Sequence, residues 1–135
     1  SGGLAVRGHI SGKDGIYAAA LLVEMLAVTG KKLSELYREI CGLYGELAYA
    51  EASFTMTNER KAELRHFLFE ELRNPDFDGV DHISREDGCK VYFTDSSWVL
   101  CRFSGTEPLL RMAAEAETDE KAQSYIQTWK AFLSL

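Results

Sequence analysis

The stretch CRFSGTEPLLRMAAEAE, residues 101 to 117, breaks a strongly apolar region with the polar segment Ser104 to Pro108 and places an arginine near each end, Arg102 and Arg111. On both sides of the polar segment, apolar residues alternate with others as they do along strands. The leucine, methionine, alanine and glutamate that follow are also good helix formers, and the serine and glutamate of the segment match a helix capping box. The pattern alone therefore leaves strand and helix open for residues 109 to 117.

The rest of the chain predicts a mixture of helices and strands. Helices are predicted where apolar residues recur at three- and four-residue spacing after a capping residue, and strands where they alternate. Asp14 and Gly30 bound the first helix, whose apolar residues predict that it is buried, and Asp87-Gly88 predicts a two-residue hairpin turn. The predicted helices are 15–29, Ser34 to near Gly45, Thr57 or Asn58 to Asn74, and Thr118 onward; the predicted strands are 46–56, 80–86, 89–94 and 97–103.

Composition and charge exclude several classes of function. The 135 residues are 46% hydrophobic, which is typical of a globular protein with one substantial core. A formal net charge of -6 disfavours binding to nucleic acid or to anionic membranes. The longest apolar stretch, Ile16 to Val28, contains Glu24 and is shorter than the roughly 20 residues that span a bilayer. A small anionic ligand stays open, because a local arginine pair acts within a Debye length of about 10 Å.

The cysteines and histidines indicate neither disulfides nor a metal. Cys41, Cys89 and Cys101 are odd in number and far apart, which is typical of reduced packing residues in a cytoplasmic protein. The three histidines are equally scattered and match no zinc spacing. We expect no metal held by this chain alone. The start at Ser1 and the absence of a signal peptide lead us to expect a piece of a longer protein.

The polar segment has the residue types of an anion-binding loop. Gly105 can adopt backbone angles closed to other residues, so that successive N–H groups form a concave nest. Ser104 and Thr106 add hydroxyl donors, and the guanidinium groups of Arg102 and Arg111 match phosphate oxygens. The residues favour a cradle for a dianion without a nucleophile. Two arginines beside a polar turn are also typical of surface salt bridges, and a non-enzymatic α+β interaction module that binds a partner's carboxylates stays open.

The segment closely resembles a known family signature. The run Arg102-Phe103-Ser104-Gly105-Thr106-Glu107-Pro108, with Leu110-Arg111 and Glu115-Ala116 after it, is similar to R-P-S-G-T-E-P-x-x-R...E-A of the α-D-phosphohexomutases. That superfamily includes phosphoglucomutases, phosphomannomutases and phosphoglucosamine mutases. Phe103 replaces the proline that is common in the loop, and Leu109 stands where many members carry lysine or another polar residue. Neither change removes a phosphate donor. The resemblance implies that the loop joins two strands and grips the substrate's phosphate. The implied phosphate-binding residues are Arg102, Ser104, Gly105, Thr106 and Arg111.

Residues 1–30 resemble the end of the third domain of the same superfamily. Ser1-Gly2-Gly3 is similar to the tail of a sugar-reading Glu-x-Ser-Gly loop, and His9 to Gly15 is similar to an H-I-x-x-K-D-G segment. The resemblance implies that Ser1 and Lys13 also bind substrate. It implies three parts, which are the end of domain three (1–30), a linker helix (31–45) and domain four (46–135).

The resemblance also implies a fold and an activity. The expected class is α+β, with a four-stranded antiparallel sheet packed by two helices as in the TATA-box-binding protein, preceded by the last helix of an α/β domain. Family members interconvert hexose 1-phosphate and 6-phosphate through a bisphosphate intermediate of the glucose 1,6-bisphosphate type, using Mg²⁺ and a phosphoserine. The motifs for both are missing from this sequence. We therefore expect no catalytic residue and no metal ligand here, and an inactive isolated chain whose partners are a sugar phosphate and the parent's other domains. A phosphoglucosamine mutase is the alternative parent.

Overall fold

The computed structural model describes residues 3–135, which divide into two compact units, one ending at Glu46 and one spanning Leu47–Leu135. The first unit contains helices α1 (Gly15–Thr29) and α2 (Leu33–Tyr44). The Asp14 side chain accepts hydrogen bonds from the backbone N–H groups of Ile16 and Tyr17, each 3.0 Å long, and Gly30 ends α1 with a left-handed φ of 65°. Both predicted caps of α1 are confirmed.

The prediction that α1 is a buried helix is wrong for this chain. None of its residues is buried, and Ile16 and Val28 are 87% and 80% exposed. A helix buries an apolar stripe only against other elements. The described part of the first unit offers α1 no other helix or strand than α2.

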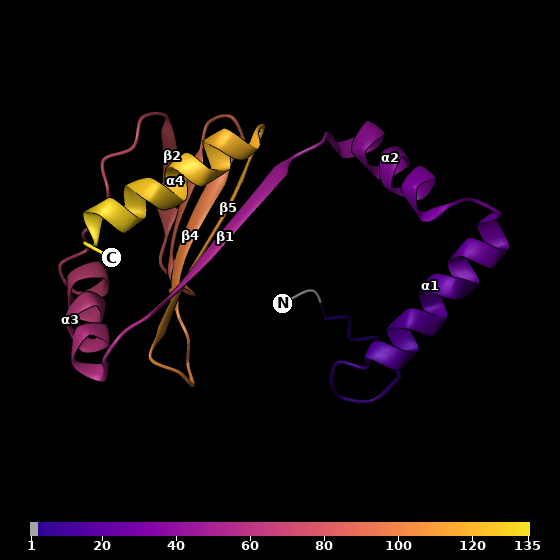
Figure 1. The fold of residues 1–135 in the computed structure, drawn as a ribbon, viewed down its shortest axis with the longest axis horizontal. Helices are drawn as coiled ribbons and strands as arrows, with labels where there is room; N and C mark the ends of the chain where they lie inside the picture. Colours follow the sequence, from indigo (N-terminus) through magenta and orange to yellow (C-terminus); the bar gives the residue numbers. More distant parts are fainter. Residues whose placement is uncertain (1–2) are drawn as a thin grey trace. The chain divides into compact units, whose positions relative to one another are not determined.

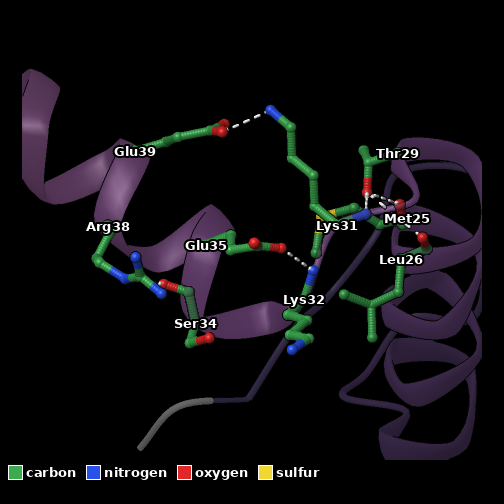
Figure 2. Close-up of polar contacts among 9 residues, drawn as sticks. All are labelled: Met25, Leu26, Thr29, Lys31, Lys32, Ser34, Glu35, Arg38 and Glu39. Carbon is green, nitrogen blue, oxygen red and sulfur yellow. Dashed lines mark hydrogen bonds and ion pairs between the residues drawn. The ribbon is translucent and has the colours of Figure 1, made fainter.

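The junction between α1 and α2 is held by polar contacts (Figure 2). The Glu35 carboxylate accepts a hydrogen bond of 2.7 Å from the backbone N–H of Lys32 and so caps the start of α2. Lys31 and Glu39 form an ion pair of 2.5 Å. α2 begins at Leu33, one residue before the predicted Ser34.

The second unit is a five-stranded antiparallel sheet with two helices, in the strand order β1-β5-β4-β3-β2 (Figure 1). The α+β class is confirmed, with five strands where the resemblance implied four. Residues 109–116 pair with strands on both sides, which decides the open choice in favour of a strand. The elements are β1 (Ala48–Thr55), α3 (Asn58–Phe69), β2 (Val80–Ser84), β3 (Cys89–Phe93), β4 (Trp98–Phe103), β5 (Leu109–Ala116) and α4 (Asp119–Phe132).

One face of the sheet forms the core, and α4 packs on this face against β1, β5 and β4 (Figure 1). Thr118 caps α4 as predicted, because its hydroxyl oxygen accepts from the N–H of Lys121 at 3.2 Å. The alternation in β3, β4 and β5 leaves the second face more open. Fully buried residues of the core include Leu68, Val91, Val99, Cys101, Leu110, Met112, Ala114 and Trp129.

Two predicted boundaries are wrong. α3 ends at Phe69, five residues before the predicted end at Asn74, because Leu72 has a left-handed φ of 56° that a helix cannot accommodate. β2 ends at Ser84, which pairs with Lys90, so the turn at Asp87-Gly88 belongs to a longer loop than the predicted two-residue turn. Gly88 is nevertheless required there, with φ at 110°.

We expect Gly88→Ala to lower the free energy of unfolding by about 2 to 3 kcal/mol, because the backbone of an alanine is strained at this positive φ. An added Cβ would also lie 2.7 Å from the carbonyl oxygen of Cys101. The control is Gly105→Ala, since a Cβ there meets no atom within 4 Å. Its effect should stay within about 0.5 kcal/mol. Urea unfolding of both variants is the measurement, and equal midpoints would contradict the prediction.

We also expect residues 47–135 to fold when expressed alone. All the hydrophobic side chains that are buried in residues 3–135, from Ala50 to Leu133, belong to this unit. Its core therefore does not depend on residues 3–46, and the shortened chain should unfold in one cooperative transition. Circular dichroism and amide NMR spectra compared with the whole chain are the measurement; a spectrum without dispersion would refute independent folding.

Candidate functional site

The polar segment forms a loop between the end of β4 at Phe103 and the start of β5 at Leu109. Its base is closed by a hydrogen bond of 2.8 Å from the N–H of Ser104 to the carbonyl of Leu109. A further bond of 3.0 Å from the N–H of Met56 to the carbonyl of Pro108 ties the loop to the end of β1. The loop is therefore supported on both sides by the sheet.

Arg102 and Arg111 lie directly opposite each other on β4 and β5, on the open face of the sheet. Opposite residues of an antiparallel pair have Cβ atoms about 4.5 to 5.5 Å apart, and like charges in this position are unfavourable. An anion that bridges the two guanidinium groups would remove this repulsion. The register thus brings together the two arginines that the sequence singled out.

Each arginine has a carboxylate beside it. Arg102 Nε lies 3.0 Å from Asp87 Oδ1, and Arg111 Nη2 lies 3.7 Å from Glu107 Oε2. The arginine side chains in these pairs are 51% and 57% exposed, so both ion pairs are surface interactions worth about 1 kcal/mol or less. A phosphate can compete with such weak pairs. Sequence reasoning treated Asp87 only as a turn residue, and no sequence signal links it to Arg102.

The backbone of the loop differs from the expectation at Gly105. Its φ lies outside the left-handed region, so the idea that Gly105 supplies angles closed to other residues is wrong. An added Cβ at Gly105 would meet no atom within 4 Å, so neither φ nor a lack of space requires glycine at this position. The Ser104 hydroxyl oxygen accepts a bond of 3.3 Å from the N–H of Glu107 and so stays close to the loop.

Lys61 of α3 also contacts the loop, and sequence reasoning missed it. Its ammonium group donates to the carbonyl oxygens of Ser104 and Glu107, at 2.7 and 2.9 Å. The two parts of this contact are more than forty residues apart in the chain. No local pattern could therefore have identified it, although the Thr57 cap correctly fixed where the helix starts.

A hollow of about 230 Å³ adjoins Arg102 on the side of the β2–β3 loop. Three guanidinium groups and two carboxylates line it, so its formal charge is positive although that of the whole chain is -6. One of these, Arg85, is fixed by hydrogen bonds to Asn74 Oδ1 and to the carbonyl of Leu72, at 2.9 and 3.0 Å. The lining residues are Arg65, Phe69, Arg85, Glu86, Asp87, Gly88, Arg102 and Phe103.

Lys13, the described candidate residue of the first unit, lies just before the start of α1. Lys13 is exposed, and its side chain lies directly against Gly3, so the two predicted motifs meet there. Asp14 caps α1 and lies 2.8 Å from His9 Nε2; these hydrogen bonds lower the pKa of its carboxyl group. Ser1 lies outside the described residues.

The described residues contain neither a cluster of metal ligands nor a membrane-spanning helix. Among residues 3–135, no three or more histidine, cysteine, aspartate or glutamate side chains are grouped so that they could hold a metal ion. No helix in the same range combines the length and the apolar character needed to cross a bilayer.

Comparison with known proteins identifies the same family for both units. Residues 49–128 match the family model described as phosphoglucomutase/phosphomannomutase, C-terminal domain, and residues 1–44 match alpha/beta/alpha domain III of the same proteins. A crystal structure of a phosphoglucomutase/phosphomannomutase family protein from Burkholderia thailandensis superposes with a TM-score of 0.60 at 24% identity. The match covers 90% of this chain and 24% of that one, and supports the fold.

Curated relatives of known family support the same family assignment. A phosphoglucomutase/phosphomannomutase of Thermococcus kodakarensis is 35% identical over 94% of this chain and 26% of its own length. A probable phosphoglucosamine mutase of Methanopyrus kandleri is 36% identical over 82% of this chain and 22% of its own length. The chain thus spans about a quarter of the length of these relatives. It belongs to the phosphoglucomutase/phosphomannomutase family, of which it holds the C-terminal part.

Proposed function

We propose that this chain is the substrate-phosphate-binding part of a phosphohexomutase, an enzyme that interconverts hexose 1-phosphate and hexose 6-phosphate. The observation that carries the proposal is the opposed pair Arg102 and Arg111 at the base of the Ser104–Pro108 loop. Family membership and the names of the relatives support this activity for the parent protein. The chain itself would bind the phosphate and perform no chemistry.

In this proposal the loop holds the phosphate that is not being transferred. The two guanidinium groups would donate hydrogen bonds to its oxygens from the sheet side, while the N–H groups of Gly105 and Thr106 and the hydroxyls of Ser104 and Thr106 would donate from the loop. Such a grip acts by positioning and by electrostatic stabilisation, which dominate catalysis of phosphoryl transfer. The remaining residues proposed to touch substrate, Ser1 and Lys13, belong to the first unit.

The family resemblance supports an assignment of this chain's residues to domains of the parent protein. We propose that residues 1–30 end domain three, that 31–45 form a linker helix and that 46–135 form domain four. The phosphoserine, the Mg²⁺ ligands and the handling of a bisphosphate intermediate would belong to the parent's other domains. Described residues of this chain show no grouping that fits Mg²⁺, so we assign the ion no part in the loop's action. The three free cysteines support the cytoplasm as the compartment.

A phosphoglucosamine mutase is the second candidate parent. Relatives named probable phosphoglucosamine mutase are 36% identical in Methanopyrus kandleri and 42% identical in Methanosarcina acetivorans, over 82% and 76% of this chain. Assays of the full-length parent on glucose 1-phosphate, mannose 1-phosphate and glucosamine 1-phosphate would decide between the candidates.

Replacement of the arginines tests the site directly. Arg102→Ala or Arg111→Ala should each weaken binding of inorganic phosphate by about 10- to 150-fold, since a hydrogen bond to a charged group contributes about 1.5 to 3 kcal/mol. The measurement is the shift of the Gly105 and Thr106 amide signals during an NMR phosphate titration. Arg73→Ala, which removes another exposed arginine of the same unit, is the control. If phosphate does not shift the Gly105 and Thr106 amide signals of the unaltered chain, the phosphate-binding role is refuted and a carboxylate-binding module is favoured.

Asp87 should compete with the phosphate for Arg102. Asp87→Asn removes the charge that lies 3.0 Å from Arg102 Nε while it keeps the shape of the side chain. We expect phosphate to bind about two- to fivefold more tightly, which corresponds to a surface ion pair of about 0.4 to 1 kcal/mol. The same titration measures it, with Asp81→Asn as a control of equal charge change. An unchanged or weaker affinity would show that Asp87 does not restrain Arg102.

A further inference from the structure

We propose that Lys61 is a positioning residue of the phosphate loop, which ties back two loop carbonyls and so leaves the loop's N–H groups to face the anion. The proposal rests on the phosphate role proposed above. The observation that supports it is the pair of hydrogen bonds from Lys61 Nζ to the carbonyl oxygens of Ser104 and Glu107, at 2.7 and 2.9 Å.

A loop that binds an anion must keep its carbonyl oxygens away from it. Each peptide group carries an acceptor as well as a donor, and a carbonyl that faces a phosphate repels it. In this loop Lys61 is the bound partner of the Ser104 carbonyl and one of two partners of the Glu107 carbonyl, which also accepts from the N–H of Leu109 at 2.8 Å. The Pro108 carbonyl accepts from the N–H of Met56 at 3.0 Å. Within residues 3–135, the N–H groups of Gly105 and Thr106 donate to no protein acceptor. Carbonyls are thus engaged at both ends of the loop, and the donors between them stay available.

The start of α3 holds Lys61 in place. The Thr57 hydroxyl oxygen accepts from the N–H of Arg60 at 3.2 Å, and the Thr57 carbonyl accepts from the N–H of Lys61 at 3.0 Å. One turn further on, Leu64 and then Leu68 are buried at 3% and 0% exposure and anchor the helix to the core. The Lys61 ammonium is therefore presented to the loop from a fixed backbone.

Lysine suits this position for two reasons. An ammonium group is compact and carries three donors, so that it can serve two carbonyls of one loop at once. Its charge also adds to the attraction for an anion, because within residues 3–135 no carboxylate lies within ion-pair distance of Lys61. Arg102 and Arg111, by contrast, have Asp87 and Glu107 beside them.

The test compares Lys61→Met with Lys130→Met in the whole chain. Both substitutions remove one positive charge and keep an unbranched side chain, but Lys130 lies near the end of α4 and its side chain makes none of the loop contacts. We expect Lys61→Met to weaken inorganic phosphate binding about tenfold, equal to about 1.4 kcal/mol. Lys130→Met should change it less than twofold. Binding is followed by NMR at Gly105 and Thr106, and thermal unfolding of both variants is measured alongside.

A second readout separates positioning from general stability. At saturating phosphate, the downfield amide proton shifts of Gly105 and Thr106 should be smaller in Lys61→Met than in the unaltered chain, because the N–H groups no longer point at the anion. Lys61→Arg, which can still donate to both carbonyls, should restore most of the affinity even if Lys61→Met lowers the melting temperature.

The possible outcomes differ clearly. If the unaltered chain binds phosphate at these amides and Lys61→Met binds equally well with equal shifts, the role of Lys61 is refuted while the proposed function stands. If Lys61→Arg binds as weakly as Lys61→Met, tethering of the carbonyls is also refuted. If the unaltered chain shows no phosphate shift at Gly105 or Thr106, both the proposed function and the role of Lys61 fail.

Discussion

The pairing of β4 with β5 is the constraint on which the rest of the site depends. Cys101 lies opposite Met112 and Phe103 opposite Leu110, and all four side chains point into the core. A shift of the register by one residue would exchange the two faces and bury arginine, at a cost of several kcal/mol for each unpaired ion. Packing of the core therefore sets the arginine pair at the base of the loop, with no help from a ligand.

The site also illustrates how local charge can oppose net charge. The chain carries -6 overall, yet two arginines and a lysine gather around one short loop. Asp87 and Glu107 reduce the repulsion within the arginine pair, because each compensates one guanidinium group through an exposed contact. Exposed contacts of this kind are weak, so they limit affinity for an anion without preventing binding. Under the proposed function, such reversible binding would suit a parent enzyme that must release its product.

Sequence could predict those parts of the fold that local rules decide. Asp14, Thr57 and Thr118 each mark a helix start, and each caps its helix in the structure. The boundaries that failed depend on tertiary context. The end of α3 is one example, since leucine has no intrinsic preference for the left-handed φ that Leu72 adopts.

The candidate site divides in the same way. The resemblance named the loop residues and implied that the loop joins two strands, whereas the alternation alone left residues 109–117 open between strand and helix. Their direct opposition could not be read from the sequence, because it depends on a register that only the packed core fixes. Lys61 and Asp87 reach the site from a helix and a turn that are distant in sequence. Gly105 was identified for the wrong physical reason, since its φ is not left-handed and an added Cβ would meet no atom within 4 Å.

The chemistry of the proposed grip bears on specificity. Its guanidinium, amide and hydroxyl groups all suit phosphate oxygens, and none is specific to a particular sugar. The segments that resemble sugar-reading motifs, around Ser1 and Lys13, lie instead in the first unit. A loop that recognises phosphate alone can hold either phosphorylated end of a hexose and can serve more than one sugar. Under the proposed function, such a grip is compatible with the similarity of the chain to relatives named for different sugars, a phosphoglucomutase/phosphomannomutase at 35% and a probable phosphoglucosamine mutase at 36% identity.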